Sequence, residues 1–295
     1  MSGPGDAGDG GSGSTLRQLS LRRLEEFGIR PKRDLGQNFL IDDNIIGVIL
    51  GQLECRPDDV VLEIGAGLGI LTQALAQVAT RVHAFEIDRG LKDPLTATLD
   101  NHANVILHFQ DILKARLEEL DPAPTLCASN LPYSVAGPFL IESLRRLPSI
   151  RRYCVMVQKE VADRIAASPG SKTYGVLSVW VQLYAAIGKS RALSRSIFYP
   201  QPHVDSSLLV LDRLTAEMLP DCDPHALQIV IQAAFGQRRK TLVNALSAGA
   251  GLGRAQALEL VESLGLPADV RAERLHPRQF VELARRLPAA SLGPD

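Results

Sequence analysis

The order of apolar and polar residues divides the chain into two parts. From residue 60 to residue 214, short apolar runs alternate with longer stretches in which apolar residues recur every three or four positions. This alternation is typical of an α/β fold in which strands and amphipathic helices follow one another. The expected strands are residues 60–64, 81–86, 104–109, 125–129, 152–158 and 207–214. Residues 176–186 are almost entirely apolar and predict a buried helix.

Beyond a boundary near residues 215–224, the pattern is helical only. The expected helices there are residues 225–235, 240–247, 254–264 and 277–287. Helices are also expected at residues 16–27 and 42–53, before the first strand, and a polar, mobile loop at residues 168–175, beside the site. The first fifteen residues are rich in Gly, Ser and Asp and predict a disordered tail. We therefore predict a tail at 1–15, an α/β domain at 16–214 and a helical domain at 215–295.

Three glycines follow the first expected strand at alternate positions: Gly65, Gly67 and Gly69. A strand, a glycine turn and a helix let a ligand approach bare backbone, because glycine accepts positive φ and has no Cβ. The alternative is a tight turn with packing glycines. The G-x-G-x-G spacing differs from the G-x-G-x-x-G of NAD proteins, and Glu63 precedes it. Both details favour a cationic ligand such as S-adenosylmethionine.

Acidic residues follow two further expected strands. Glu86 ends the second strand, 17 residues after Gly69, and Asp111 follows the third. At the carboxyl edge of such a sheet, an acid can accept hydrogen bonds from ribose hydroxyls, which is the role we predict for Glu86. Asp111 can accept from an adenine amino group. The alternative for Glu86 alone is a helix-capping acid.

The fourth expected strand ends in Asn130-Leu131-Pro132-Tyr133, a tetrad suited to methylation of an adenine amine. The Asn130 side-chain oxygen and the Leu131 carbonyl can accept hydrogen bonds from the two N–H groups of the amine, which directs the nitrogen lone pair at a methyl group. Pro132 has no competing N–H. Tyr133 offers a ring for base stacking, worth ~1–3 kcal/mol per base. The alternative is an Asx turn.

Phe198 is a candidate for a second stacking face. It lies in the loop before the last expected strand. A core aromatic residue at the base of a loop is the competing interpretation.

Cysteine and histidine usage limits the class of protein. The four cysteines are far apart and form no C-x-x-C pair, which favours reduced thiols in a cytoplasmic protein. The six histidines form no metal-binding pair, so we expect no metal site. No apolar run is long enough for a transmembrane helix.

The net charge of −1 conceals a segregation of charge along the chain. Residues 34–142 carry a net −10, whereas residues 16–33 carry +4 and residues 143–213 carry +7. Such blocks suggest a polyanion partner, with ordinary solvated faces as the alternative. Arg238, Arg239 and Lys240 lie in the first turn of the helical domain. They can neutralise RNA phosphates or form a solvated turn.

In their order, these motifs resemble those of the rRNA adenine N6-dimethyltransferase family, from about Leu16 to Leu287. The matching segments are Gly36-Gln37-Asn38-Phe39-Leu40, Glu63-Ile64-Gly65-Ala66-Gly67, Glu86-Ile87-Asp88, Gln110-Asp111, Asn130-Leu131-Pro132-Tyr133, Gln158-Lys159-Glu160-Val161, residues 171–175, Phe198-x-Pro-x-Pro-x-Val-Asp-Ser and Gln237-Arg238-Arg239-Lys240-Thr241-Leu242.

The resemblance implies a Rossmann-like class I methyltransferase with a mainly parallel seven-stranded sheet and a helical RNA- or ribosome-binding domain. Its cofactor would be S-adenosylmethionine, contacted by Asn38, Leu40, Gly65, Glu86, Asp111 and Asn130, to which we add Gly67, Ile87 and Ile112.

The implied reaction is dimethylation of two adjacent adenines in the 3′-terminal hairpin loop of 16S rRNA. The substrate would be a nearly assembled 30S subunit and the enzyme a monomer, with an effect on kasugamycin sensitivity. Adenines in a loop are already partly unstacked, which lowers the cost of moving one into a pocket.

Two alternatives use the same scaffold. One is the macrolide-resistance type of methyltransferase, which acts on 23S rRNA. The amino-acid sequences of the segments that begin at Phe198 and Gln237 favour the small-subunit type. The other is a ribosome-assembly or RNA-binding factor without catalysis. The intact tetrad and cofactor motifs favour an enzyme.

Overall fold

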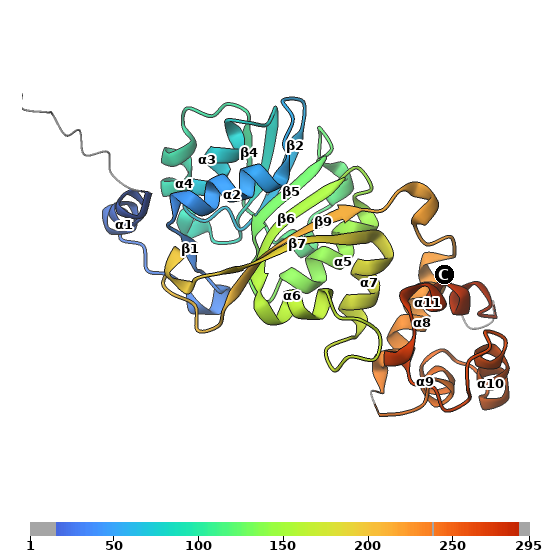
Figure 1. Ribbon diagram of the computed structural model, residues 1–295. Helices are drawn as coiled ribbons and strands as arrows, with labels where there is room; N and C mark the ends of the chain where they lie inside the picture. The colour runs from blue at the N-terminus through green and yellow to red at the C-terminus, as the bar shows by residue number, and fades with distance from the viewer. Residues whose placement is uncertain (1–15, 238, 289–295) are drawn as a thin grey trace, which may run out of the picture.

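The computed structural model describes residues 16–237 and 239–288. Figure 1 shows a central sheet covered by helices, followed by a cluster of helices at the end of the molecule opposite α1 (Leu16–Glu26). The predicted tail at 1–15 and Arg238 lie outside the described residues. Within the described ranges, no helix has the length and apolar character needed to cross a membrane.

The central sheet has seven strands in the order β4-β3-β2-β5-β6-β9-β7. Its strands are β2 (Val60–Ile64), β3 (Arg81–Phe85), β4 (Val105–His108), β5 (Leu126–Asn130), β6 (Arg152–Gln158), β7 (Ala185–Leu193) and β9 (Ser206–Arg213). The first five strands in this order are parallel, and β9 runs antiparallel to both β6 and β7. The predicted Rossmann-like, mainly parallel sheet is confirmed. Because the parallel strands end at one edge, their C-terminal residues meet there.

Helices cover both faces of the sheet (Figure 1). On one face lie α2 (Asp43–Leu53), α3 (Ile70–Ala76) and α4 (Lys92–Leu99), and on the other α5 (Ala136–Arg146), α6 (Lys159–Ile165) and α7 (Val176–Tyr184). Each face of the sheet has its own apolar core. Successive side chains of β2 point to opposite faces, so Val61 lies in the core beneath α2–α4 and Leu62 in the core beneath α5–α7. Asp42 caps α2 by accepting a hydrogen bond from Ile45 N at 3.1 Å.

The expected helix at residues 176–186 is too long by two residues, and the strand after it was not predicted. The helix ends at Tyr184, and β7 begins at Ala185. Residues 188–192 of β7 are exposed at the sheet edge, and the register with β9 shifts between Ile187 and Ser190. The strand therefore depends on pairing with β9 rather than on an apolar pattern of its own.

A small sheet joins two distant segments. Strand β1 (Phe39–Leu40) pairs antiparallel with β8 (Phe198–Tyr199), and Phe39 lies opposite Tyr199. Beside this pair, Ile41 N donates to the Ile197 carbonyl at 2.9 Å. The segment before α2 is thereby attached to the loop before β9.

The C-terminal helices are α8 (Pro224–Gly236), α9 (Leu242–Gly249), α10 (Arg254–Glu262) and α11 (Pro277–Arg285). Their apolar core includes Trp180 and Leu183 of α7. The loop expected beside the site, residues 168–175, lies against these helices instead: Gly170 N donates to the Glu273 carbonyl at 2.6 Å. The Tyr174 hydroxyl donates to the Leu275 carbonyl at 2.8 Å.

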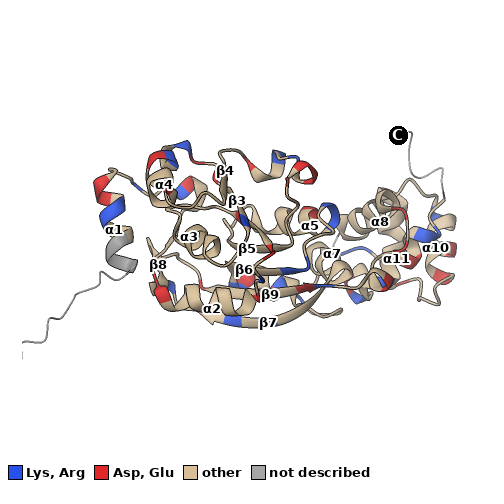
Figure 2. Cartoon of the chain, turned by 90° about the horizontal axis from the view of Figure 1, so that it is seen from above, with Lys and Arg blue, Asp and Glu red and all other residues tan. Residues whose placement is uncertain are grey.

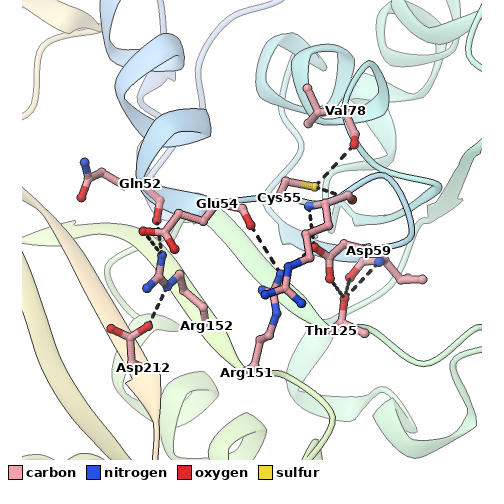
Figure 3. Close-up of polar contacts among 11 residues, drawn as sticks. Gln52, Glu54, Cys55, Asp59, Val78, Thr125, Arg151, Arg152 and Asp212 are labelled. Atoms are coloured by element: carbon pink, nitrogen blue, oxygen red, sulfur yellow. Dashed lines mark hydrogen bonds and ion pairs between the residues drawn. The ribbon is translucent and has the colours of Figure 1, made fainter.

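A polar network joins the amino ends of the central strands, at the edge opposite the strand ends discussed above (Figure 3). Arg151 donates to Asp59 at 2.7 Å, and Asp59 also accepts from the Thr125 hydroxyl at 2.7 Å. Arg152 pairs with Glu54 and with Asp212, each at 2.6 Å. These contacts connect the starts of β2, β5 and β6 to the end of α2.

Candidate cofactor and substrate site

One cavity at the carboxyl edge of the sheet brings together the residues predicted for cofactor binding and catalysis. All of them line it: Asn38, Leu40, Gly65, Gly67, Glu86, Ile87, Asp111, Ile112, Asn130, Leu131, Pro132, Tyr133 and Phe198. They come from the ends of β2, β3, β4 and β5 and from the small β1–β8 sheet. Their roles remain predictions, but their convergence on one cavity is observed.

Two glycines form bare backbone in the cavity wall. Gly65 has φ +76° and Gly67 has φ +59°, values that favour glycine. A Cβ at Gly65 would lie 3.5 Å from the Asn130 carbonyl oxygen and from Pro132 Cδ. A Cβ at Gly67 would lie 3.1 Å from the Phe39 ring. The glycine loop therefore packs directly on the tetrad and suits a ligand that lies against main chain.

Glu86 is 7% exposed and stabilises the loops around it. Its carboxylate accepts from Gly67 N at 2.9 Å and from Asp88 N at 2.8 Å. Burial raises the pKa of this carboxyl, and the two backbone hydrogen bonds offset only part of that rise. A carboxylate has about four acceptor sites, so the Glu86 carboxylate keeps acceptor capacity for ribose hydroxyls.

The neighbouring wall combines an apolar surface with a second acid. Ile87 is 51% exposed, unusual for isoleucine, and Ile112 is buried beside the same cavity. Asp111 accepts from Leu113 N at 3.0 Å, so one of its oxygens caps the turn Ile112–Lys114. This arrangement fits a flat, partly apolar group such as adenine with an amino edge.

Asn130 is oriented by a contact that the sequence does not suggest. Its Nδ2 donates to the Asn38 carbonyl at 2.9 Å, whereas the Asn38 side chain donates to the Gly36 carbonyl at 3.0 Å. The Asx-turn alternative is wrong, because such a turn needs the side-chain oxygen to accept from the main-chain N–H of residue 132, and Pro132 has none. Among residues 16–237 and 239–288, none donates a hydrogen bond to Asn130 Oδ1. That oxygen remains available as an acceptor in the cavity.

The two aromatic candidates differ in setting. Tyr133 is half-buried, and burial raises the pKa of its hydroxyl despite the nearby Ser206. Phe198 is buried in the core cluster on the α2–α4 face of the sheet, yet its side chain also contributes to the cavity wall. The core interpretation of Phe198 is therefore correct as far as burial goes, and it does not exclude contact with a base.

The segment before α2 covers part of the cavity, and the contacts that hold it there were not predicted from the sequence. Residues 32–40, here called the N-terminal strap, lie against Asp88, which is almost fully buried. Asp88 accepts from Lys32 Nζ at 2.7 Å and from Gln37 Nε2 at 2.8 Å. Burial raises the pKa of Asp88, but these hydrogen bonds outweigh it and leave the pKa lowered. Both partners lie in or beside quoted motifs, yet sequence alone does not pair them.

The predicted RNA-binding residues lie elsewhere. Arg239 and Lys240 are exposed in the turn between α8 and α9 and do not line the cavity. Across the described part of the chain, no three or more His, Cys, Asp or Glu side chains are grouped to bind a metal ion.

Comparison with known proteins places the chain in a family. The family model for ribosomal RNA adenine dimethylase matches residues 28–288. A protein named ribosomal RNA small subunit methyltransferase A from Streptomyces griseus is 43% identical over 271 residues, which cover 90% of this chain and 92% of the relative. The protein of the same name from Rhodococcus opacus is 41% identical, covering 94% and 96%.

Solved structures share the fold. A dimethyladenosine transferase from Plasmodium falciparum has a TM-score of 0.71 at 24% identity, covering 83% of this chain and 95% of that one. The 23S rRNA methyltransferase ErmE has a TM-score of 0.61 at 26% identity, covering 85% and 99%. The chain therefore belongs to the ribosomal RNA adenine dimethylases, enzymes that transfer methyl groups from S-adenosylmethionine to the N6 amino group of adenine.

Proposed function

We propose that the protein dimethylates N6 of two adjacent adenines in the 3′-terminal hairpin loop of 16S rRNA, late in assembly of the 30S subunit. One structural observation carries the chemistry: at the wall of the cavity formed by the glycine loop, Asn130 Oδ1 accepts no hydrogen bond from the part of the chain that the structure describes. The small-subunit assignment is supported by the names of relatives at 41–43% identity.

The chain's own groups then orient the target amine. S-adenosylmethionine, when bound, supplies an electrophilic methyl group. Asn130 Oδ1 and the Leu131 carbonyl accept the two N–H bonds of the adenine amine, which directs its lone pair away from the ring. Pro132 adds no competing donor. The Tyr133 and Phe198 rings border the base, and no strong general base is required because the proton can leave after methyl transfer.

The cofactor also fits the rest of the cavity. Glu86 would offer acceptors to the ribose hydroxyls of the cofactor, Asp111 would accept from the amino group of the cofactor's adenine, and Asn38 and Leu40 of the strap would lie beside it. Gly67 and Gly65 leave room against main chain, and Ile87 and Ile112 supply apolar contact. The buried carboxyl group of Glu63, two residues before Gly65, suits a cationic ligand.

A cluster of unpaired cations supports an RNA-binding role for the C-terminal domain, residues 215–295, beside a catalytic domain at 16–214. Three segments meet there, since Leu242 N donates to Val270 O at 2.7 Å and Gly170 N to Glu273 O at 2.6 Å. We define this basic patch as the exposed cations of these three segments that make neither an ion pair nor a side-chain hydrogen bond within the described residues: Lys172, Arg239, Lys240, Arg271 and Arg274.

Other cations of the same domain are already used by the protein. Arg285 pairs with Asp221 and Glu282, and Arg254 bonds to Asn244. Both signs of charge accordingly occur on α10 and α11 (Figure 2). Asp269 and Glu273 reduce the charge of the basic patch but leave it positive. Unpaired cations are the ones free to neutralise phosphates.

The test is methyl transfer to purified subunits. Small and large subunits from a strain lacking the gene are incubated in parallel with labelled S-adenosylmethionine, and primer extension then maps the modified adenines. We expect label only in the small subunit, with paired stops at adjacent adenines near its 3′ end. Label confined to large-subunit RNA would instead support the macrolide-resistance type, whose fold is similar.

An assembly factor without catalysis is the remaining candidate. Binding to small subunits without any methyl transfer would favour it. We expect the enzyme to work as a cytoplasmic monomer, which sedimentation of the purified protein and fractionation of cells can test.

A further inference from the structure

Glu63 is a buried acid that has no counter-charge. It lies on β2, it is 1% exposed, and it lines the cavity two residues before the glycine loop. Its Oε2 atom is buried without a hydrogen-bond partner, and no Lys, Arg or His among the described residues pairs with it. A bare carboxylate in such a place is costly, so the neutral acid is the stable form.

A second orphaned group lies beside it. Thr72 of α3 is fully buried, and its hydroxyl also lacks a hydrogen-bond partner of ordinary geometry. The hydroxyl nevertheless lies near enough to the Glu63 carboxyl to favour its charged form. The other titratable group that acts on Glu63 is Glu86, at the end of β3. The Cys127 thiol of β5 is buried nearby, and a charge on Glu63 would raise the pKa of that thiol. The charge of Glu86 opposes the ionisation of Glu63.

These surroundings set the protonation state. Burial raises the pKa of Glu63, the Thr72 hydroxyl offsets part of that rise and the Glu86 charge adds to it, which together give a pKa of about 8. At neutral pH the free protein therefore carries a protonated Glu63. A cation placed in the cavity would reverse this balance, because an opposite charge favours the ionised form.

We propose that Glu63 carries a proton in the free enzyme and releases it when S-adenosylmethionine binds. The O–H bond of the carboxylic acid breaks, the proton passes to solvent, and the carboxylate pairs with a positive group of the cofactor. Thr72 then donates its hydroxyl to the new carboxylate. The inference rests on the proposed function, because it takes this cavity to be the cofactor site.

Cofactor affinity should consequently depend on pH. Below the pKa of free Glu63, each binding event releases one proton, so the dissociation constant falls about tenfold for each unit of rise in pH. Above that pKa the dependence from Glu63 ends. The α-amino group of the cofactor itself titrates near pH 7.7–8.0 and adds its own contribution. A variant without the Glu63 proton is therefore needed as the reference.

The experiment is calorimetric titration of S-adenosylmethionine into the purified full chain at pH 6.5, 7.5 and 9, in two buffers of different ionisation enthalpy. The difference between buffers counts the protons released. We expect about one more proton for the wild type than for Glu63→Gln at pH 6.5, and no difference at pH 9. Glu63→Gln keeps the shape of the side chain, and its affinity should lose the tenfold dependence.

Equal proton counts for both proteins at pH 6.5 would overturn the proposal. If Glu63→Gln does not fold, the wild type at pH 6.5 decides, because the α-amino group of the cofactor is already protonated there. A release of no protons at that pH contradicts the proposal. Failure of any cofactor to bind at any pH would instead reject the cavity assignment. With S-adenosylhomocysteine, which lacks the sulfonium charge, an undiminished count would identify the ammonium group as the partner of Glu63.

Discussion

Asn130 donates a hydrogen bond from its side-chain amide to the main-chain carbonyl of Asn38, at 2.9 Å. The donor is the first residue of the tetrad, and the acceptor lies in the N-terminal strap. Because the NH2 group is occupied, the amide cannot rotate to exchange its oxygen and nitrogen without losing this bond. The strap therefore determines which atom Asn130 presents to an adenine amine.

Replacing Asn130 with alanine should reduce kcat on the order of 10²-fold, since alignment of the amine is lost while the cavity persists. The dissociation constant of S-adenosylmethionine should change by less than that. Asn38→Ala is the matched control, because it keeps the acceptor carbonyl. It should affect cofactor affinity more than kcat. Single-turnover methylation with a separate binding titration checks both variants, and an unchanged kcat in Asn130→Ala would reject the orienting role.

Gly65→Ala should damage the cavity through the backbone. An alanine at φ +76° is strained by about 1 kcal/mol or more, and its Cβ would contact Asn130 and Pro132. We expect weaker cofactor binding and a lower melting temperature. Gly47→Ala is the control, since Gly47 lies in α2 with no atom near its absent Cβ. Equal behaviour of the two variants would count against a special conformation at Gly65.

Glu86→Ala should abolish cofactor binding and methyl transfer while small-subunit binding persists. The carboxylate supports Gly67 N and Asp88 N as well as any ribose, so its loss also loosens the glycine loop. Glu86→Gln retains an acceptor for one of these amides, and we expect an intermediate affinity. Pull-down with small subunits and equilibrium binding of the cofactor separate the two effects. Normal methylation by Glu86→Ala would contradict the ribose assignment.

The basic patch should control the salt dependence of RNA binding. Replacing Arg239 and Lys240 with glutamine should weaken binding and flatten the slope of log K against log salt by about one unit per lost phosphate contact. Arg285→Gln, which removes a paired cation, should leave the slope unchanged. Filter binding of small-subunit rRNA over a salt series measures it. An unaltered slope would indicate that this turn is an ordinary solvated surface. The same replacement at Arg238 should have the same effect.

A histidine pair predicts loss of stability in mild acid. His83 Nδ1 lies 3.1 Å from His108 Nε2, and His83 Nε2 lies 2.9 Å from the Pro122 carbonyl. Burial lowers the pKa of both rings. The unfolded chain then binds more protons below about pH 6.5, so stability is lost as pH falls, by about 1.4 kcal/mol per unit of pKa lowering.

Urea unfolding at pH 7.5 and pH 5 tests this pair. His83→Gln should reduce the difference between the two pH values, whereas a replacement at the exposed His225 should not. A difference that persists in His83→Gln would assign the acid sensitivity to other groups.

The sheet and the cavity could be predicted because their signals are local. A short apolar run such as residues 60–64 predicts a buried strand, whichever strands lie beside it in the sheet. Glu86, Asp111 and Asn130 each follow such a run. Parallel strands end at one edge, so these side chains had to converge. Every predicted cofactor and catalytic residue lines the resulting cavity.

What could not be predicted depends on contacts between distant residues. Strand β7 contains Gly188, Lys189 and Ser190, which have little strand preference, and it exists because β9 pairs with it. Phe39 and Tyr199 pair across the small sheet without any periodic pattern in two-residue strands. The hydrogen bond between Asn130 and Asn38 has no sequence signal, since either side chain can bond to its own turn.

The strap also has a consequence for the order of events during synthesis. Residues 32–40 leave the ribosome early, but their partner Asp88 emerges about fifty residues later and Phe198 much later still. The strap can therefore reach its final position only when most of the chain has been made. The cavity is then completed by the strap and by the segment around Phe198 together. A nascent chain stopped before β8 also lacks β9, so it should pair only the five parallel strands and contain no competent methylation site.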